Sequence, residues 1–431
     1  MVNRFTLTAL SLALLPVAAQ SASSDEPLHV WTRSSKDGRK TYDAIAAAFT
    51  KKTGIRVEYF NALNDYEQRL ARAAVGGHMP DVIVNELGTV GQLVNMGVAT
   101  EIARASIAGN EDLLDSAWKA ATLPDGKTYG VPTSVQTHVL FIRKDWREKL
   151  GLPVPRNWED LAQLARAFTE RDPDGNGRRD TYGLAFPGGA TRGYAAWYLS
   201  SFLFQAGGEF QRAGPDGRMH GALDEPAAVA TLNLFRRMVC EEHSVQPNAI
   251  NATTQETNKV FSSGQAGLYL SGPYHIALFD KEPGRDRYEV VPLPAGPSGQ
   301  RASLAGGELA YIARNTSQPE RAKQFVEFLI SPEGQALGTR PPAGGLPVVR
   351  LPVNRKVDAA QAHGDERWAM VAQEYAQHGH PLPQARNWSR LQQLAADGFN
   401  AILAHCSKDI PGDLRALNAR FNAELARQEA Q

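Results

Sequence analysis

An alternating run of acidic and amide side chains is the clearest metal-binding pattern in this sequence. Its members are Asp172, Asp174, Asn176, Arg178 and Asp180. They match alternate positions of the first nine in a Ca2+-binding loop of the EF-hand type, and a glycine between them allows the sharp turn that such a loop needs. Gly183 stands where that loop would have a bidentate Glu. Two interpretations stay open, a structural Ca2+ site and an Asx-rich turn.

Carboxylates that could serve as acid or nucleophile occur at Glu86, Glu209 and Glu308. A glycosidase needs two such groups on either side of the glycosidic bond, and nothing in the sequence pairs these three. The sequence has no Gly-x-Ser-x-Gly elbow, no His-Glu-x-x-His helix and no P-loop. We therefore predict that the protein is not an enzyme, with a secreted glycosidase and a surface adhesin as the alternatives.

The first part of the chain alternates short apolar strands with amphipathic helices. The predicted strands are residues 28–32, 55–59 and 81–85, and the predicted helices are residues 42–53 and 66–76. This order indicates a parallel sheet covered by helices, in which ligands bind at the carboxyl ends of the strands.

Polar side chains follow two of these strands. Asn85 and Glu86 come directly after the third strand, and Trp31 and Arg33 lie at the end of the first. We expect these four residues to contribute to a binding site, because polar residues after a buried strand lie where ligands bind. Trp31 could instead cap the core.

A second set of elements begins at residues 131–141. Asn157 opens a helix, and the Pro/Gly-rich segment 292–299 predicts a crossover between two lobes. Ser317, with Glu320 three residues later, predicts the capping box of a further helix. The fold class predicted from this pattern is α/β with two lobes.

The composition excludes some classes of partner. The 431 residues include 46 Lys plus Arg and 46 Asp plus Glu, so the formal net charge is zero. This balance removes the basic field that a nucleic-acid-binding protein uses to attract phosphates. A small neutral molecule is the better fit.

The N-terminus carries the pattern of an export signal. Arg4 precedes an apolar stretch at residues 7–17, and small residues follow, so we predict a signal peptide over residues 1–22. The only cysteines are Cys240 and Cys406, and neither lies near the signal as a lipid-anchoring cysteine would. We therefore expect a protein without a lipid anchor, and the sequence does not decide between a disulfide and two free thiols.

Several phrases, in this order, resemble the maltose-binding-like solute-binding proteins of ABC importers. They are KKTGIRVEYF, GGHMPDVIVN, QLVNMGVATEI, DGKTYGVPTSVQTHVLFIRKDW, NWEDLAQLARAF, DPDGNGRRDTYGL, FQAGGEF, FSSGQAGLYLSGPY and ERAKQFVEFLISPEGQ. The resemblance covers nearly the whole chain after the signal. Each phrase alone is weakly specific, whereas their colinear order is specific for the family but not for its ligand.

The resemblance implies a periplasmic binding protein of type II, with hinge crossovers and a ligand cleft. It implies a first lobe of residues 23–136 plus 297–345, and a second lobe of residues 137–296 plus 346–431 with the C-terminal helices. A periplasmic monomer of this kind captures a solute by hinge closure and delivers it to a membrane permease, without a required cofactor.

The resemblance also implies which side chains line the cleft. By similarity these are Asn85, Glu86, Gln136, His138, Tyr194, Trp197, Tyr274, Gly307, Glu308, Arg386 and Trp388. Sugars bind to such sets, because aromatic rings cover their CH faces and planar polar groups bond their hydroxyls. Trp197 could equally be core packing, and His138 could belong to the hinge.

The predicted ligand is a mono-, di- or oligosaccharide. Arg33, Arg192 and Arg386 keep a second class open, phosphorylated polyols such as glycerophosphodiesters, because a guanidinium can clasp a phosphate.

Overall fold

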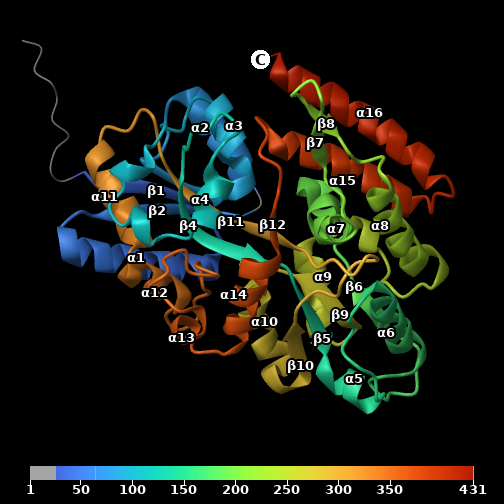
Figure 1. The fold of residues 1–431 in the computed structure, drawn as a ribbon. Coiled ribbons are helices and arrows are strands. Elements are labelled where there is room, and N and C mark those ends of the chain that lie inside the picture. Colours follow the sequence, from blue (N-terminus) through green and yellow to red (C-terminus); the bar gives the residue numbers. More distant parts are fainter. Residues whose placement is uncertain (1–25, 64, 431) are drawn as a thin grey trace, which may run out of the picture.

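The computed structural model describes residues 26–63 and 65–430 (Figure 1). The predicted signal peptide, residues 1–22, lies outside the described residues. Within the part of the chain that the structure describes, no helix is long and apolar enough to cross a membrane.

The first sheet has the strand order β12-β11-β3-β1-β2, and β4 also pairs with β11. Its strands are β1 (Leu28–Arg33), β2 (Val57–Ala62), β3 (Val82–Glu86), β4 (Val131–Thr137), β11 (Ser303–Ile312) and β12 (Gly379–Pro381). β1 runs parallel to β2 and β3, as predicted, whereas β11 runs antiparallel to β3 and β4. The predicted strand 55–59 lies two residues later as β2, because its pairing with β1 begins at Val57.

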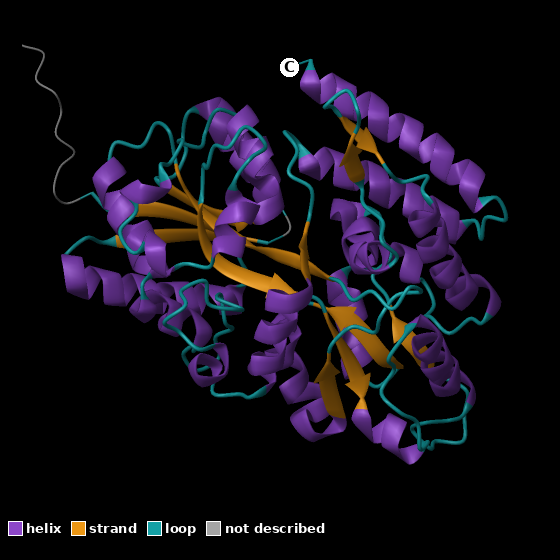
Figure 2. Cartoon of the chain, in the orientation of Figure 1, coloured by secondary structure: helices purple, strands orange, loops and turns teal. Residues whose placement is uncertain are grey.

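Helices cover both faces of this sheet (Figure 2). They are α1 (Lys36–Thr53), α2 (Tyr66–Gly76), α3 (Val90–Asn95), α4 (Asp115–Ala121), α11 (Pro319–Ile330), α12 (Pro332–Thr339), α13 (Ala359–His363) and α14 (Arg367–His378). Successive side chains of β3 point to opposite faces, so Val82 and Val84 join the apolar cluster of α1 and α11, and Ile83 joins the cluster of α2 and α3.

The second sheet has the strand order β10-β5-β9-β6. Its strands are β5 (Val139–Arg143), β6 (Tyr182–Ala185), β9 (Ala266–Ser271) and β10 (Tyr288–Val291), and a separate hairpin pairs β7 (Gln211–Ala213) with β8 (Met219–Gly221). The helices of this lobe are α5 (Lys144–Lys149), α6 (Trp158–Glu170), α7 (Tyr194–Gln205), α8 (Pro226–Arg236), α9 (Thr254–Ser262), α10 (Ile276–Phe279), α15 (Trp388–Ala404) and α16 (Ile410–Glu429). Two α/β lobes result, as predicted.

The chain passes between the two sheets in short crossovers. Only His138 separates β4 of the first sheet from β5 of the second, and residues 292–302 connect β10 back to β11. At this junction the Ser303 hydroxyl donates to the His138 carbonyl at 2.7 Å, and Thr137 Oγ1 lies 2.8 Å from Ser303 Oγ. The two crossovers are therefore hydrogen-bonded to each other and form one hinge.

Residues after 345 return to the first sheet before the chain crosses again. Leu351 forms a bridge with Val135 of β4, the Val353 amide donates to Gln335 Oε1 at 2.8 Å, and β12 pairs with β11. The family resemblance implies that this stretch belongs to the second lobe. These contacts favour a last crossover between β12 and α15 instead.

Local capping explains where two predicted helices begin. Asn157 Oδ1 accepts the Asp160 amide at 2.8 Å and caps α6, which confirms the predicted start. The capping box predicted at Ser317 is wrong, because α11 begins at Pro319 with no side-chain cap. Pro319 occupies the first turn, where its fixed φ favours a helix start.

A disulfide joins Cys240 to Cys406, which resolves the alternative that the sequence left open. Cys240 belongs to the π-helical turn after α8 (Arg237–Glu241), and Cys406 follows the end of α15. The bond connects residues 166 positions apart in sequence, both within the second lobe.

Candidate functional site

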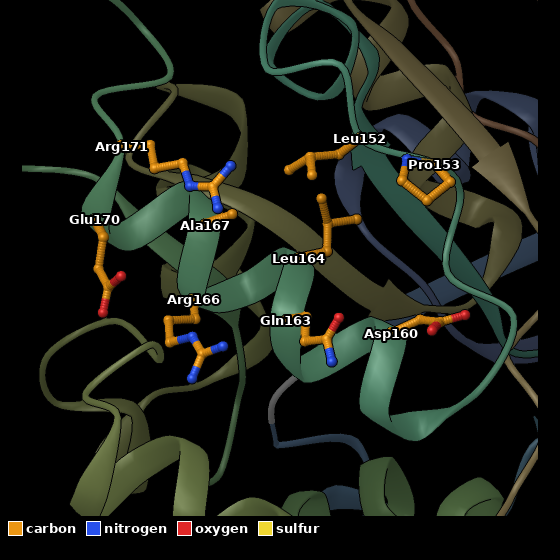
Figure 3. Close-up of a pocket in the computed structure, with 9 residues that line it drawn as sticks. All are labelled: Leu152, Pro153, Asp160, Gln163, Leu164, Arg166, Ala167, Glu170 and Arg171. Carbon is orange, nitrogen blue, oxygen red and sulfur yellow. The ribbon is translucent and has the colours of Figure 1, made fainter.

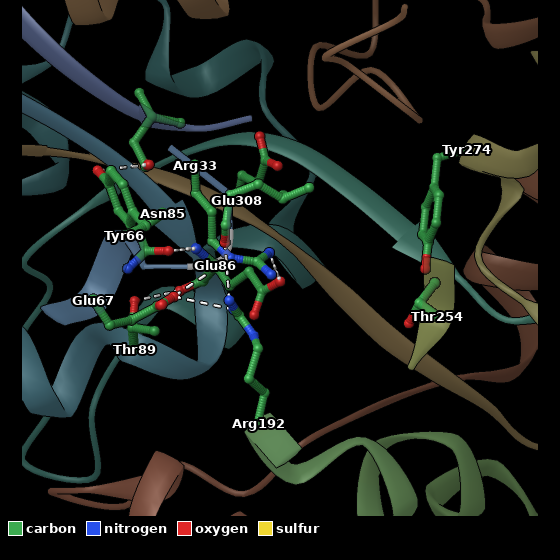
Figure 4. Close-up of polar contacts among 12 residues, drawn as sticks. Arg33, Tyr66, Glu67, Asn85, Glu86, Thr89, Arg192, Thr254, Tyr274 and Glu308 are labelled. Atoms are coloured by element: carbon green, nitrogen blue, oxygen red, sulfur yellow. Dashed lines mark hydrogen bonds and ion pairs between the residues drawn. The ribbon is translucent and has the colours of Figure 1, made fainter. Parts of the chain in front are cut away.

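Three charged side chains meet at the carboxyl edge of the first sheet. Arg33 ends β1, Glu86 ends β3, and Glu67 lies in the first turn of α2 (Figure 4). Arg33 forms an ion pair with Glu86, and its Nε lies 3.4 Å from Glu67 Oε1. Burial opposes the charge of Arg33, but the two carboxylates outweigh it and raise the Arg33 pKa. The neighbouring ends of β1 and β3 thus bring Arg33 and Glu86 together, as the sequence indicated.

A second ion pair lies beside the first. Glu308 stands opposite Glu86 in the register of β11 and β3, and Arg350 Nη1 lies 2.7 Å from Glu308 Oε1. Burial, which the Arg350 charge opposes, raises the pKa of Glu308. Arg350 is not among the residues predicted from the sequence, because it lies in no motif and has mainly apolar neighbours there.

Aromatic side chains of the second lobe lie across from these charges. Tyr194 and Trp197 are both half-buried on α7, and Tyr274 follows β9. Figure 4 shows Tyr274 and Thr254 standing apart from the cluster around Glu86. The Tyr274 hydroxyl lies 3.3 Å from Ser271 Oγ, and the Arg350 guanidinium lies 6.0 Å from the centre of the Tyr274 ring. Arg350 is therefore within cation–π distance of the second lobe.

Trp31 and Asn85 use their side chains within the first lobe. Trp31 packs against Phe60 with ring centres 4.7 Å apart, at the edge of the α2 and α3 cluster. Asn85 is buried, and its Oδ1 accepts the backbone amide of Glu86 at 2.8 Å. Both shape the edge of the sheet on which Arg33 and Glu86 stand.

The hinge contains three further residues of the predicted site. His138 is fully buried, its Nδ1 lies 2.8 Å from Ser201 Oγ, and burial lowers its pKa to about 3. A Cβ at Gly307 would lie 2.3 Å from the Ser134 carbonyl oxygen, so the close pairing of β11 with β4 requires a glycine there. Gln136 Oε1 is buried without a hydrogen-bond partner among the described residues. The geometry gives His138 and Gly307 structural roles.

Arg386 and Trp388 lie where the two lobes are joined, and not on an open surface between the lobes. The Arg386 carbonyl accepts the side-chain amide of Asn95 at 2.9 Å, and the Arg386 side chain is exposed. Trp388 is 2% exposed, with its ring packed edge-on against Phe210. An indole buried to this degree offers no face to a solute in this conformation.

The Asp172–Asp180 loop is closed by its own hydrogen bonds. The Asp172 carboxylate accepts backbone amides of Gly175 and Gly177, each at 3.0 Å. The Asn176 side-chain amide donates to Asp174 at 2.8 Å and to Asp180 at 3.0 Å. The residues that the structure describes contain no group of three or more His, Cys, Asp or Glu placed to hold a metal ion. Ca2+ at this loop therefore stays a prediction, and the Asx-rich turn is what the structure shows.

A cavity of about 160 Å3 lies along α6 (Figure 3). Leu152, Leu164 and Ala167 form its apolar part, with Arg166 and Arg171 beside them. Because none of the predicted site residues lines it, this cavity is distinct from the candidate site.

The sequence matches one family over most of its length. Residues 33–336 match the profile of the bacterial extracellular solute-binding proteins. The chain belongs to this family. Its members are substrate-binding transport proteins, and the family's description places them outside the cytoplasm.

Curated relatives and solved structures agree with this family. The chain is 25% identical over 343 residues to a maltooligosaccharide ABC transporter solute-binding lipoprotein of Streptococcus pneumoniae, covering 75% of each chain. It is also 25% identical over 339 residues to the maltodextrin-binding protein MdxE of Bacillus subtilis, again covering 75% of each.

Among solved structures, maltose-bound MalE3 of T. maritima has a TM-score of 0.78 at 18% identity, covering 92% of this chain and 98% of that one. The sugar-binding protein MalE of Xanthomonas citri has a TM-score of 0.73 at 21% identity, covering 94% and 98%. These likenesses confirm the two-lobe fold of a periplasmic binding protein.

Proposed function

We propose that this solute-binding protein captures a neutral carbohydrate between its lobes and delivers it to the permease of an ABC transporter. The observation that carries this proposal is that the two lobes contribute different kinds of side chain to the candidate site. Carboxylates and guanidinium groups, most of them largely shielded from solvent, lie on the first lobe, and half-buried aromatic rings lie on the second. Hydroxyls bond to the former and sugar CH faces pack on the latter.

The charge balance favours a neutral solute over a phosphorylated polyol. Arg33 is paired with Glu86, and Arg350 is paired with Glu308. A phosphate bound here would have to compete with these carboxylates for the same guanidinium groups and would meet their repulsion. The hydroxyls of a sugar can instead bond to both members of each pair, because a carboxylate accepts and a guanidinium donates.

The relatives support a carbohydrate without fixing its size. Those of Streptococcus pneumoniae carry names for maltooligosaccharides and fructooligosaccharides. We assign this chain the same broad class of solute, a mono-, di- or oligosaccharide.

We place the protein in the periplasm as a monomer without a lipid anchor, exported by the signal peptide of residues 1–22 and performing no chemistry on its solute. The sequence of residues 1–22 and the absence of a cysteine beside them support the unanchored export. Membership of a family of solute-binding transport proteins supports the absence of hydrolysis.

A screen of thermal shifts tests this function. We expect a carbohydrate to raise the melting temperature, since a ligand that binds only the native state stabilises it. The same mixtures are then assayed for cleavage of the sugar. A shift with glycerophosphodiesters and not with sugars would overturn the choice of ligand, and release of shorter sugars would overturn the binding-only function.

We also retain Ca2+ as a ligand of the Asp172–Asp180 loop. Saturating Ca2+ at about ten times its dissociation constant should then add about 1.4 kcal/mol of stability to the chelator-treated protein. Asp174→Asn should abolish that gain. A melting temperature that does not change with Ca2+ in the wild type would show that the loop does not bind the ion.

A further inference from the structure

One arginine of the second lobe reaches into the carboxylates of the first. Arg192 lies in the turn that precedes α7, and its Nη2 lies 3.3 Å from Glu67 Oε1. Its Nη1 donates to the Leu63 carbonyl, in the loop before α2, at 2.9 Å. Figure 4 shows Arg192 pointing away from its own helix toward Glu67 and Arg33.

The local structure of the second lobe does not favour an arginine at position 192. Arg192 has φ 58°, a left-handed conformation that is unfavourable for a residue with a side chain. Its guanidinium is also close in sequence to the N-terminus of α7, where the helix dipole disfavours a positive charge. Both costs need an offsetting contact, and Glu67 and Leu63 of the other lobe provide one.

Hydrogen bonds from another helix hold the turn that carries Arg192 in place. The Gln393 side-chain amide donates to the Ala190 carbonyl at 2.7 Å, and the Gln392 amide donates to the Gly193 carbonyl at 3.3 Å. Both glutamines belong to α15. The second lobe therefore presents Arg192 in a fixed direction rather than on a loose loop.

Glu67 connects Arg192 to the candidate site. The same carboxylate oxygen lies 3.4 Å from Arg33 Nε, and Arg33 is paired with Glu86. Both ends of the Arg192–Glu67 contact are largely shielded from solvent, with side chains 22% and 29% exposed. Such shielding makes an ion pair less sensitive to salt than one on the open surface.

We propose that the Arg192–Glu67 pair is an interlobe latch that holds the two lobes closed in the absence of solute and positions Arg33 for the solute. Arg192 thereby sets the closed fraction of the protein, and with it the apparent affinity for any solute that binds only the closed form. The link to affinity rests on the proposed function, whereas the closure of the free protein does not.

Small-angle X-ray scattering of the ligand-free protein tests the latch. We expect Arg192→Ala and Glu67→Gln each to increase the radius of gyration, and Arg192→Lys to restore much of the compactness. The matched control is Arg147→Ala, since Arg147 also binds carboxylates, Glu289 and Glu148, and one backbone carbonyl, Leu152, but within the second lobe. Thermal melts of each variant identify those that fail to fold.

Solute binding provides the second readout. Arg192→Ala should weaken the affinity for every solute that binds by the same factor, roughly threefold to tenfold, whereas a direct ligand contact would change the ranking among solutes. Equal radii of gyration for wild type, Arg192→Ala and Glu67→Gln would overturn the latch. Failure of all carbohydrates to bind would overturn the proposed function and leave the scattering result to stand.

Discussion

The two lobes contribute to the candidate site in different ways. The first lobe places charged side chains at the ends of β1 and β3 and on β11, so backbone pairing fixes their spacing. The second lobe places aromatic rings on α7 and after β9, where packing between elements fixes them. Strand pairing is regular along each strand, whereas helix packing varies with the side chains at each contact. The difference explains why Arg33 and Glu86 could be placed from the strand pattern, whereas the aromatic residues of the second lobe were named only through the family resemblance.

Replacing Trp388 with alanine should have the largest effect. The indole is buried at the start of α15, so we expect a loss of about 4 kcal/mol in the free energy of unfolding from the lost burial and the cavity. Urea denaturation measures it. If Trp388→Ala instead kept its stability and lost affinity for sugar, Trp388 would be a ligand-binding residue, as the resemblance implies.

Arg350→Ala should cause the second-largest loss in the free energy of unfolding. Removing the guanidinium leaves Glu308, whose side chain is only 12% exposed, without its ion-pair partner, which costs about 3 kcal/mol. The double variant Arg350→Met with Glu308→Leu should lose less, since it removes both charges. Denaturation curves in which the double variant is the less stable of the two would show that the pair stabilises the fold.

Acid should destabilise the hinge through His138. Its folded-state pKa is lowered by burial from 6.5 to about 3, so below 6.5 the unfolded chain binds a proton that the folded chain does not. The stability contributed by neutral His138 is therefore complete above pH 6.5 and is lost as the pH falls toward the folded-state pKa.

Between about pH 7 and about pH 5 we expect the wild type to lose about 2 kcal/mol more than His138→Gln. Chemical denaturation at the two pH values measures the difference. Parallel losses in the two proteins would mean that His138 is protonated while folded.

Trp197→Ala should have the smallest effect on the fold and a specific effect on binding. Trp197 is half-buried on α7, so we expect a modest change in stability and a loss of about 1–2 kcal/mol in sugar binding if the ring packs on the solute. Titration calorimetry measures the second quantity. An unaltered affinity would assign Trp197 to the packing around His138, which its ring meets edge-on at 4.2 Å.

The sequence predicted the two-lobe fold, the parallel start of the first sheet and the proximity of the strand ends that carry Arg33 and Glu86. It could do so because apolar periodicity and strand ends are local features. Arg350 and Arg192 could not be assigned in this way, since each is recruited by a carboxylate distant in sequence, Glu308 and Glu67 respectively. The burial of Trp388 could not be predicted from residue type, because the indole of Trp197 is half-exposed whereas that of Trp388 is buried.

The central claim is that one carbohydrate contacts both lobes at once. Titration calorimetry with the sugar that gives the strongest thermal shift tests it directly, comparing the wild type with Arg33→Met in the first lobe and Trp197→Ala in the second. The account predicts that each change alone weakens binding of the same sugar. Full affinity in either variant would contradict it, because the solute would then be held by one lobe only.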